Sequence, residues 1–338
     1  MRIDLRSDTL TKPTKEMLEA MMAANVGDDV FGDDPTVNEL QDRMAKMFNM
    51  EAAIYCPSGT MTNQIGMRML TEPQDEVICH KYSHVYLYEG GGMMANSSLS
   101  PKLLEGDRGR ITADQIVQNI NNPDDIHLPI SKLVVLENTM NKGGGSIYDL
   151  SEIKKIKQVC NDHNLAMHLD GARLFNALVE TKESPRQYGE LFDSISICFS
   201  KGLGAPIGSV LLGSHESIKK AKRIRKAMGG GMRQAGYLAA ACIYALDHHV
   251  DRLKEDHKRA KQIGEILKRN AFISDIYPVD TNIVIAELKG VSVEEFLKNL
   301  AAKNVFAVKF GPNLVRFVTH LDFNDDHLNQ FEKVIKNI

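Results

Sequence analysis

The 338-residue sequence lacks tryptophan, and its five cysteines are odd in number and form no C-x-x-C pair. A secreted disulfide framework has an even set of cysteines, and a redox or zinc motif of the common kinds needs a close pair. The first residues include the charged Arg2, Asp4 and Arg6 and form no apolar signal region. We therefore expect a reduced protein of the cytoplasm.

Long apolar runs and an excess of one charge are also missing. No stretch approaches the roughly 20 apolar residues that span a bilayer. The 41 basic and 44 acidic side chains give a formal net charge of -3. This balance gives no electrostatic reason for nucleic acid or an anionic membrane to bind, so small-molecule partners are favoured. With 43% hydrophobic residues, the chain can bury a large core and hold more than one domain.

Short β-rich runs alternate with helical patterns between about residues 36 and 215. Such alternation is typical of an α/β protein with a mostly parallel sheet between helices. The last part reads strand-helix-strand-strand-helix, which predicts a small α+β domain. We expect an N-terminal segment at 1–12 that contributes to the active site, a large domain at 13–247 and a small domain at 248–338. The expected strands are 52–56, 76–79, 132–136, 165–169, 194–199, 209–212, 282–288, 305–310 and 314–319.

Helices are expected from apolar periodicity. Residues 14–24 form one, with Met17, Leu18, Met21 and Met22 on one face and the three methionines as core filler. A long helical stretch covers 236–270 and is broken near His248 and His249, and 293–303 is a third helix.

Two charged residues follow neighbouring strand patterns. Asp170 follows the apolar run 165–169, and Lys201 follows 195–199 and precedes a Gly-x-Gly turn. An α/β sheet brings such strand ends to one crevice. A lysine amine and a carboxylate there indicate pyridoxal phosphate chemistry, in which the amine forms a Schiff base and the acid pairs with the pyridinium nitrogen. Taken singly, each residue is as well explained as a surface lysine or a turn aspartate.

Two further motifs extend this candidate site. Gly59 and Thr60 begin a helical pattern after the strand 52–56, where free backbone N–H groups can bind phosphate. An ordinary Ser/Thr helix cap explains the same residues about as well. His84 follows the strand 76–79, and an imidazole there can stack on a ring and relay a proton. His80 and His84 have no third ligand at suitable spacing, and the acidic loop 26–35 does not match an EF-hand, so no metal is expected.

These motifs together resemble the low-specificity L-threonine aldolases, in order through nearly the whole chain. The residues that carry the resemblance are Leu5 to Thr9, Gly27 to Thr36, Pro57 to Thr60, Leu136 to Thr139, His168 to Arg173, Ser200 to Gly204 and Gly229 to Gln234. The resemblance implies the aspartate aminotransferase-type fold (fold type I) with a seven-stranded sheet. It also implies a homo-oligomer with active sites at a dimer interface, commonly a tetramer of two dimers.

The resemblance also implies roles for single residues. Lys201 is the Schiff-base lysine, Asp170 the pyridinium partner, His84 the stacking residue and His127 a second active-site histidine near the β-hydroxyl. The remaining cofactor-binding residues are Gly59, Thr60, Arg173, Ser200 and Arg233. Those that hold the substrate carboxylate are Ser7, Arg173 and Arg316. From the residues alone, Arg316 is as well explained by a rim salt bridge, and Arg173 by an ion pair with Asp170.

The implied reaction is retro-aldol cleavage of L-threonine and L-allo-threonine to glycine and acetaldehyde, with slower action on related β-hydroxy-α-amino acids. His84 or His127, directly or through a water, is the candidate base, and the sequence does not choose between them. Phe31 and Met140 replace a tyrosine and a histidine that are frequent in the family. The alternatives are a β-eliminating lyase of the same fold that releases pyruvate and ammonia, or a non-catalytic protein that binds pyridoxal phosphate. A dinucleotide-binding dehydrogenase lacks its G-x-G-x-x-G after the first strand.

Overall fold

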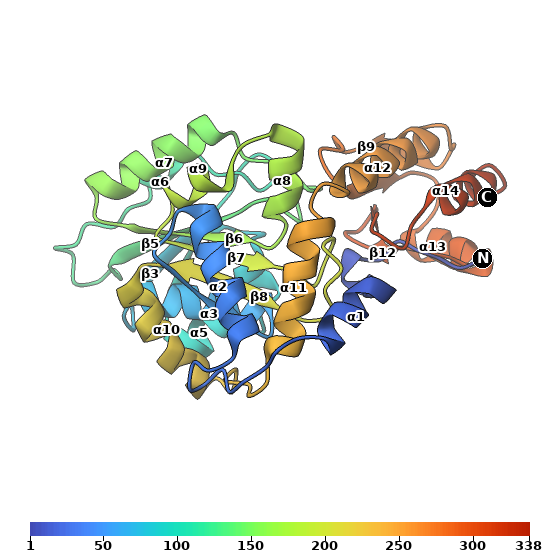
Figure 1. Ribbon diagram of the computed structural model, residues 1–338. Helices are drawn as coiled ribbons and strands as arrows, with labels where there is room; N and C mark the ends of the chain where they lie inside the picture. The colour runs from blue at the N-terminus through green and yellow to red at the C-terminus, as the bar shows by residue number, and fades with distance from the viewer.

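A computed structural model describes residues 1–338, and a seven-stranded sheet runs through the larger part of the molecule (Figure 1). The strand order is β2-β8-β7-β6-β5-β3-β4, and only β8 is antiparallel to its neighbours. The predicted α/β class and mostly parallel sheet are therefore confirmed. The strands are β2 (Ala52–Cys56), β3 (Glu76–His80), β4 (Ser100–Leu104), β5 (Ser131–Glu137), β6 (Ala166–Gly171), β7 (Ser194–Cys198) and β8 (Ser209–Gly213).

Strand β4 is the one member of this sheet that the sequence does not predict. It contains Pro101, which cannot donate a ladder hydrogen bond and argues against a strand. Because β4 pairs only with β3, it is an edge strand, and a proline is tolerated there.

Two layers of helices cover the sheet, and the strand residues alternate between them. In β5, Val134 and Leu136 belong to one apolar cluster, whereas Leu133 and Val135 belong to another. This is the period-two alternation expected of a strand that is buried on both faces. The first layer contains α2 (Pro35–Phe48), α6 (Ala113–Val117), α7 (Leu150–Asp162), α8 (Leu174–Thr181), α9 (Pro185–Gly189) and α11 (Gly236–His248). The second contains α3 (Gly59–Leu70), α4 (His84–Leu87), α5 (Gly92–Ser97) and α10 (His215–Ala227).

Helix α1 (Lys15–Met22) confirms the first predicted helix but corrects its apolar face. It packs beside α11, and Met17 is fully buried there. Met22 is 80% exposed and Leu18 is 46% exposed, so they are not core filler. Met17 and Met21 lie four residues apart on the face toward the core, and Leu18 and Met22 form the adjacent row of the helix surface.

The predicted break in the stretch 236–270 is confirmed. Helix α11 ends at His248, and α12 (Leu253–Lys268) begins after a short turn. Helix α12 packs mainly in a second apolar core with the C-terminal elements. The domain boundary expected after residue 247 stays a prediction.

The C-terminal part is a four-stranded antiparallel sheet with helices, at the right of Figure 1. The predicted strand 305–310 is two short pieces, because β11 pairs with β1 in a small parallel sheet and β12 pairs with β13. Strand β9 was not expected from its sequence Ile-Ser-Asp-Ile, which has two polar residues in four. The elements are β1 (Ile3–Asp4), β9 (Ile273–Ile276), β10 (Ile283–Leu288), α13 (Val293–Ala302), β11 (Val305–Phe306), β12 (Val308–Lys309), β13 (Leu314–Val318) and α14 (Asp325–Ile335).

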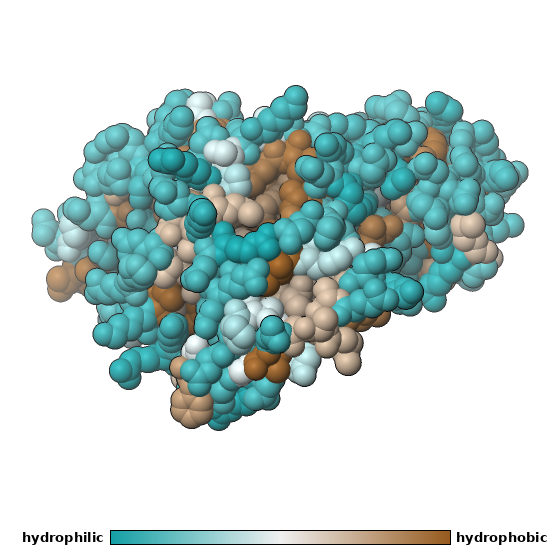
Figure 2. Space-filling model, in the orientation of Figure 1, coloured by the Kyte–Doolittle hydropathy of each residue, from teal (hydrophilic) through white to brown (hydrophobic).

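Hydrophilic side chains cover most of the face in Figure 2, and apolar side chains lie between them in separate patches. No helix is both long and apolar enough to cross a lipid bilayer.

Candidate active site

The carboxyl ends of the parallel strands bring the predicted site residues to one edge of the large sheet. Asp170 lies at the end of β6, and Lys201 lies three residues beyond the end of the neighbouring β7. Gly204 turns the chain after Lys201 with a φ of +78°, and its N–H donates to the Lys201 carbonyl. The strand order therefore places the predicted acid and amine at adjacent positions of the same edge.

Asp170 is a buried acid without a cation. It is 1% exposed, and none of the ion pairs of the chain includes it. Its Oδ2 accepts from Asn63 Nδ2 at 3.0 Å, and its Oδ1 accepts from the Ala172 N–H at 3.1 Å. A buried carboxylate that only neutral groups contact is costly to keep ionised. A positively charged group of a ligand would balance it, as a protonated ring nitrogen does.

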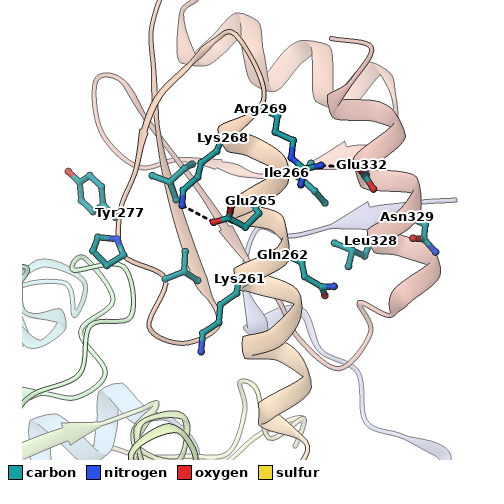
Figure 3. A pocket seen from close by; sticks show the side chains of 14 residues that line it. Lys261, Gln262, Glu265, Ile266, Lys268, Arg269, Tyr277, Leu328, Asn329 and Glu332 are labelled. Atoms are coloured by element: carbon teal, nitrogen blue, oxygen red, sulfur yellow. Dashed lines mark hydrogen bonds and ion pairs between the residues drawn. The ribbon is translucent and has the colours of Figure 1, made fainter.

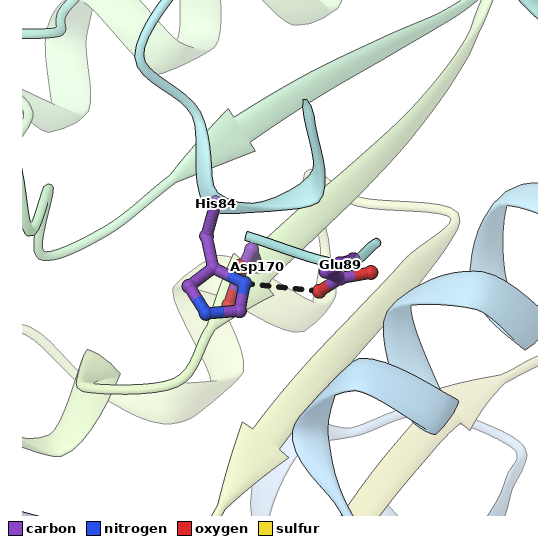
Figure 4. Close-up of side chains that lie close together, drawn as sticks. All are labelled: His84, Glu89 and Asp170. Atoms are coloured by element: carbon purple, nitrogen blue, oxygen red, sulfur yellow. Dashed lines mark hydrogen bonds and ion pairs between the residues drawn. The ribbon is translucent and has the colours of Figure 1, made fainter. Parts of the chain in front are cut away.

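His84 lies beside Asp170 and contacts a second buried acid, Glu89 (Figure 4). The distance between His84 Nδ1 and Glu89 Oε1 is 3.0 Å. Asn63 Nδ2 and Gln64 Nε2 also donate to Glu89, at 2.8 and 2.6 Å. Sequence reasoning missed Glu89, since a glutamate before a run of glycines carries no signal of burial.

His168 supports Asp170 through Asn63, which contacts both residues. Its Nε2 lies 3.1 Å from Asn63 Oδ1, and its Nδ1 lies 2.7 Å from Ser194 Oγ. Burial lowers the pKa of His168 to about 4, against the opposing charge of Asp170, so the ring is neutral. A Cβ on Gly66 would lie 2.5 Å from the ring, so glycine is needed for this close approach of α3.

Glu137, at the end of β5, joins the same group of acids. Its two carboxylate oxygens accept from the backbone N–H groups of His84 and Asn141, at 2.8 and 2.9 Å. Burial and the charge of Asp170 raise the pKa of Glu137. It therefore anchors the segment that carries His84 to the end of the neighbouring strand.

Arg173 has a different partner from the one the sequence suggests. Its Nε and Nη2 both donate to Asp8, each at 2.7 Å, and not to Asp170. Asn282 Nδ2 also donates to Asp8, at 3.2 Å. Burial opposes ionisation of Asp8, but the charge and hydrogen bonds of Arg173 outweigh it and lower the pKa of that carboxyl. Asp8 thus fixes the orientation of the Arg173 guanidinium.

Arg316 forms no salt bridge, so the rim ion pair considered from the sequence is wrong. Its Nη1 donates to Asn141 Oδ1 at 2.8 Å, and its Nη2 donates to the Arg6 carbonyl at 2.9 Å. Its Nε is buried without a partner. Burial and the nearby charge of Arg173 lower the pKa of Arg316 to about 10. Arg173 and Arg316 carry two positive charges and Asp8 one negative charge, so this part of the site has an excess positive charge that favours an anion.

The start of helix α3 has the properties of a phosphate site. The backbone N–H groups of Gly59 and Thr60 make no hydrogen bond, and Ser58 caps the helix through Met61. Ser209 Oγ is buried without a partner and would lie 3.7 Å from a Cβ on Gly59. The helix cap is therefore confirmed, and the phosphate site stays a prediction that the free donors suit.

Other predicted site residues lie apart from this group. His127 is exposed on the loop before β5, and its hydrogen bond is a backbone one to Asp125. Arg233 is half-exposed and pairs with Asp28 at 3.0 Å. Ser7 Oγ accepts from Thr9, and Ser200 Oγ lies 3.3 Å from Cys198 Sγ. No hydrogen bond or ion pair joins these four residues to Asp170, His84 or Glu89 within one chain.

A hollow of about 840 Å³ lies elsewhere (Figure 3). It lies in the small domain between α12, α14 and the segment around Tyr277. Its charged side chains pair with one another, as in Lys268 with Glu265 and Arg269 with Glu332. It contains none of the predicted site residues.

The fold and the strand-end group of acids, arginines and a lysine agree with the family model for beta-eliminating lyases, which matches residues 4–290. The low specificity L-threonine aldolase of Escherichia coli K12 is 44% identical over 330 residues, which cover 96% of each chain. Low-specificity L-threonine aldolase 1 of Arabidopsis thaliana is 38% identical, with 94% of this chain and 91% of that protein covered. The chain therefore belongs to the beta-eliminating lyase family, among the low-specificity L-threonine aldolases.

A solved structure agrees with the fold. The threonine aldolase of Leishmania major superposes with a TM-score of 0.85 over 99% of each chain, at 20% sequence identity. The predicted fold class is confirmed by this likeness. The names of these relatives argue against the dehydrogenase interpretation, since they are aldolases.

Proposed function

We propose that this protein cleaves L-threonine and L-allo-threonine to glycine and acetaldehyde, with pyridoxal phosphate as cofactor, and acts more slowly on other β-hydroxy-α-amino acids. The observation that carries the proposal is Asp170, a buried acid without a cation beside the strand that leads to Lys201. The names of the relatives support the choice of threonine.

The residues fit the cofactor at three points. The Lys201 amine would hold its aldehyde carbon, and Asp170 would face its ring nitrogen. The free N–H groups of Gly59 and Thr60, with the unpartnered Ser209 hydroxyl, would bind its phosphate. Arg233 and Ser200 are further candidates for this end. When bound, pyridoxal phosphate supplies an electron sink for the Cα–Cβ bond that breaks.

The chain's own residues bind and orient the substrate. Arg173 and Arg316 present two guanidinium groups to the amino-acid carboxylate, and Ser7 is placed one residue before the Asp8 that holds Arg173. This two-point hold fixes how the Cα–Cβ bond lies in the site. His84 would stack on the cofactor ring, and His84 or His127, directly or through a water, would take the hydroxyl proton. Glu137 holds the His84 backbone in place.

The proposal includes assembly into a tetramer of two dimers in the cytoplasm. Large apolar side chains that a single chain leaves in solvent support an interface between copies, among them Met22 at 80%, Phe31 at 77% and Met94 at 69% exposure. Light scattering of the purified protein measures the number of chains.

Removal of the Lys201 amine tests the reaction. Purified protein with pyridoxal phosphate and L-threonine should release acetaldehyde, which alcohol dehydrogenase and NADH detect. Lys201→Ala should abolish this release and the visible absorbance of the bound cofactor. Lys219→Ala, an exposed lysine on α10, is the matched control and should behave as wild type.

The other outcomes identify the alternatives. Release of pyruvate and ammonia without acetaldehyde would indicate the β-eliminating reaction instead. A protein that binds the cofactor and turns over no β-hydroxy amino acid would be the non-catalytic form. Full activity in Lys201→Ala would refute the role of the lysine.

A further inference from the structure

The hydrogen bonds around His84 distinguish between the two candidate bases. We propose that Glu89 is a positioning residue that holds the proton of His84 on Nδ1, so that Nε2 accepts the β-hydroxyl proton of the substrate. The inference rests on the proposed cleavage of a β-hydroxy amino acid.

Glu89 accepts a hydrogen bond from an amide on each of its two carboxyl oxygens. Its side chain is fully buried, and it accepts from Asn63 Nδ2 at 2.8 Å and Gln64 Nε2 at 2.6 Å. The amides only donate here, so His84 Nδ1 is the one partner whose role is open. Because each oxygen of Glu89 already accepts from an amide N–H, as the oxygens of a carboxylate do, we assign His84 Nδ1 as the donor across the 3.0 Å contact.

The orientation of both amides is determined by their other partners. Asn63 must turn its Nδ2 toward Asp170 and Glu89, because both are acids, and its Oδ1 toward His168 Nε2. Gln64 Oε1 in turn accepts from Asn96 Nδ2 at 3.2 Å. The donors to Glu89 are therefore fixed, and with them the tautomer of His84.

The other nitrogen of His84 is available to a substrate. Nε2 makes no hydrogen bond within the chain, and Figure 4 shows it pointing away from Glu89. The side chain is 29% exposed, so a ligand can reach it. In the step, the hydroxyl O–H bond breaks and its proton goes to Nε2. The electron pair left on oxygen forms the carbonyl of acetaldehyde as the Cα–Cβ bond breaks, and the Cα–Cβ electron pair stays with Cα, which then takes up a proton to give glycine.

The charges around His84 suit this task. Those that face it are Glu89, Asp170 at the end of β6 and Glu137 at the end of β5. Burial of the ring opposes its protonation, but the hydrogen bond to Glu89 and the charges of the other two acids outweigh burial and raise the pKa of His84. A base gains strength as its pKa rises toward the working pH. His127 has no such partner, because its side chain is exposed and makes no hydrogen bond.

Histidine acylation measures the His84 pKa without turnover. Diethyl pyrocarbonate acylates unprotonated imidazole, and trypsin releases residues 82–102, in which His84 is the only histidine. The rate of acylation of this peptide against pH should have a midpoint at higher pH in the folded protein than in the urea-unfolded chain. Glu89→Gln should lower the midpoint by about one unit or more, because it removes the charge and keeps the shape. Glu265→Gln, an exposed glutamate on α12, should leave it unchanged.

The pH dependence of acetaldehyde release is the second measurement. The acidic limb of the kcat profile should move to lower pH in Glu89→Gln, keep its wild-type position in His127→Asn and disappear in His84→Asn. A wild-type midpoint no higher in the folded than in the unfolded protein would overturn the inference, as would loss of the limb in His127→Asn. Absence of acetaldehyde from the wild-type protein would instead overturn the proposed function and, with it, the role of Nε2.

Discussion

Replacement of Asp8 by asparagine should destabilise the protein far more than a usual surface change. Asp8 is fully buried and holds the Arg173 guanidinium by two hydrogen bonds of 2.7 Å, and the Arg173 side chain is only 7% exposed. The neutral amide would leave this charge uncompensated, near the second, half-buried guanidinium of Arg316. Removal of one partner of a buried ion pair costs about 3–5 kcal/mol. That is a large share of the roughly 5–15 kcal/mol that stabilises a folded protein.

Urea unfolding followed by circular dichroism measures this effect. The matched control is Asp247→Asn, since Asp247 also pairs with an arginine, Arg43, but at the surface. Exposed pairs contribute about 0–1 kcal/mol, so the control should unfold close to wild type. The double variant with Arg173→Met should recover part of the loss, because no unpaired charge remains. Equal unfolding midpoints for Asp8→Asn and Asp247→Asn would refute the reasoning.

The same pair has a pH signature. Arg173 lowers the pKa of the Asp8 carboxyl in the folded state, because its charge and hydrogen bonds outweigh the opposing effect of burial. The stabilisation is therefore complete above the ordinary carboxyl pKa of about 4 and is lost as the pH falls below it. The unfolding free energies of wild type and Asp8→Asn should converge in that acidic range, and curves that stay parallel would contradict the assignment.

Two further predictions concern single buried groups. Arg316→Met should raise KM for L-threonine roughly 10- to 100-fold, since a charged hydrogen-bond donor is lost. The urea unfolding midpoint should stay equal or rise, because the unpaired Nε is removed. An unchanged KM in steady-state kinetics would count against a role of Arg316 in carboxylate binding. Burial lowers the pKa of His168 to about 4 in the folded protein. As the pH falls, the ring is therefore protonated first in the unfolded chain. The free energy of unfolding should fall by up to roughly 3 kcal/mol between pH 6.5 and 4. His168→Gln should flatten that part of the curve of unfolding free energy against pH, and an unaltered slope would show that the ring is not the source.

The elements that the sequence predicted well are those whose burial is uniform. Strands such as β5 and β8 contain continuous apolar runs because helices cover both faces. Strands β4 and β9 escaped prediction because edge pairing tolerates the proline and the polar residues that they contain. The chain turns between β11 and β12 from one partner strand to another, and such a change of partner leaves no mark in apolar periodicity.

The predictions for the site divide along the same line. Asp170 and Lys201 follow strand patterns, and strand ends are readable from sequence. The partner of Arg173 cannot be read from the sequence, because Asp8 lies 165 positions away. Asn282, the residue before β10 of the small sheet, also donates to Asp8. Glu89 was missed for a similar reason: its burial depends on amides of α3 that contact it only in the folded chain. Polar pairs made across long sequence separations have no local pattern.

The first eleven residues link two parts of the molecule. Strand β1 pairs with β11 beside the small sheet, and Asp8 contacts Arg173 at the start of α8 in the large domain. A truncation of these residues would therefore remove the partner strand of β11 and the counter-ion of Arg173 together. Fusion partners for immobilisation belong behind α14, where the chain leaves the fold at its own surface.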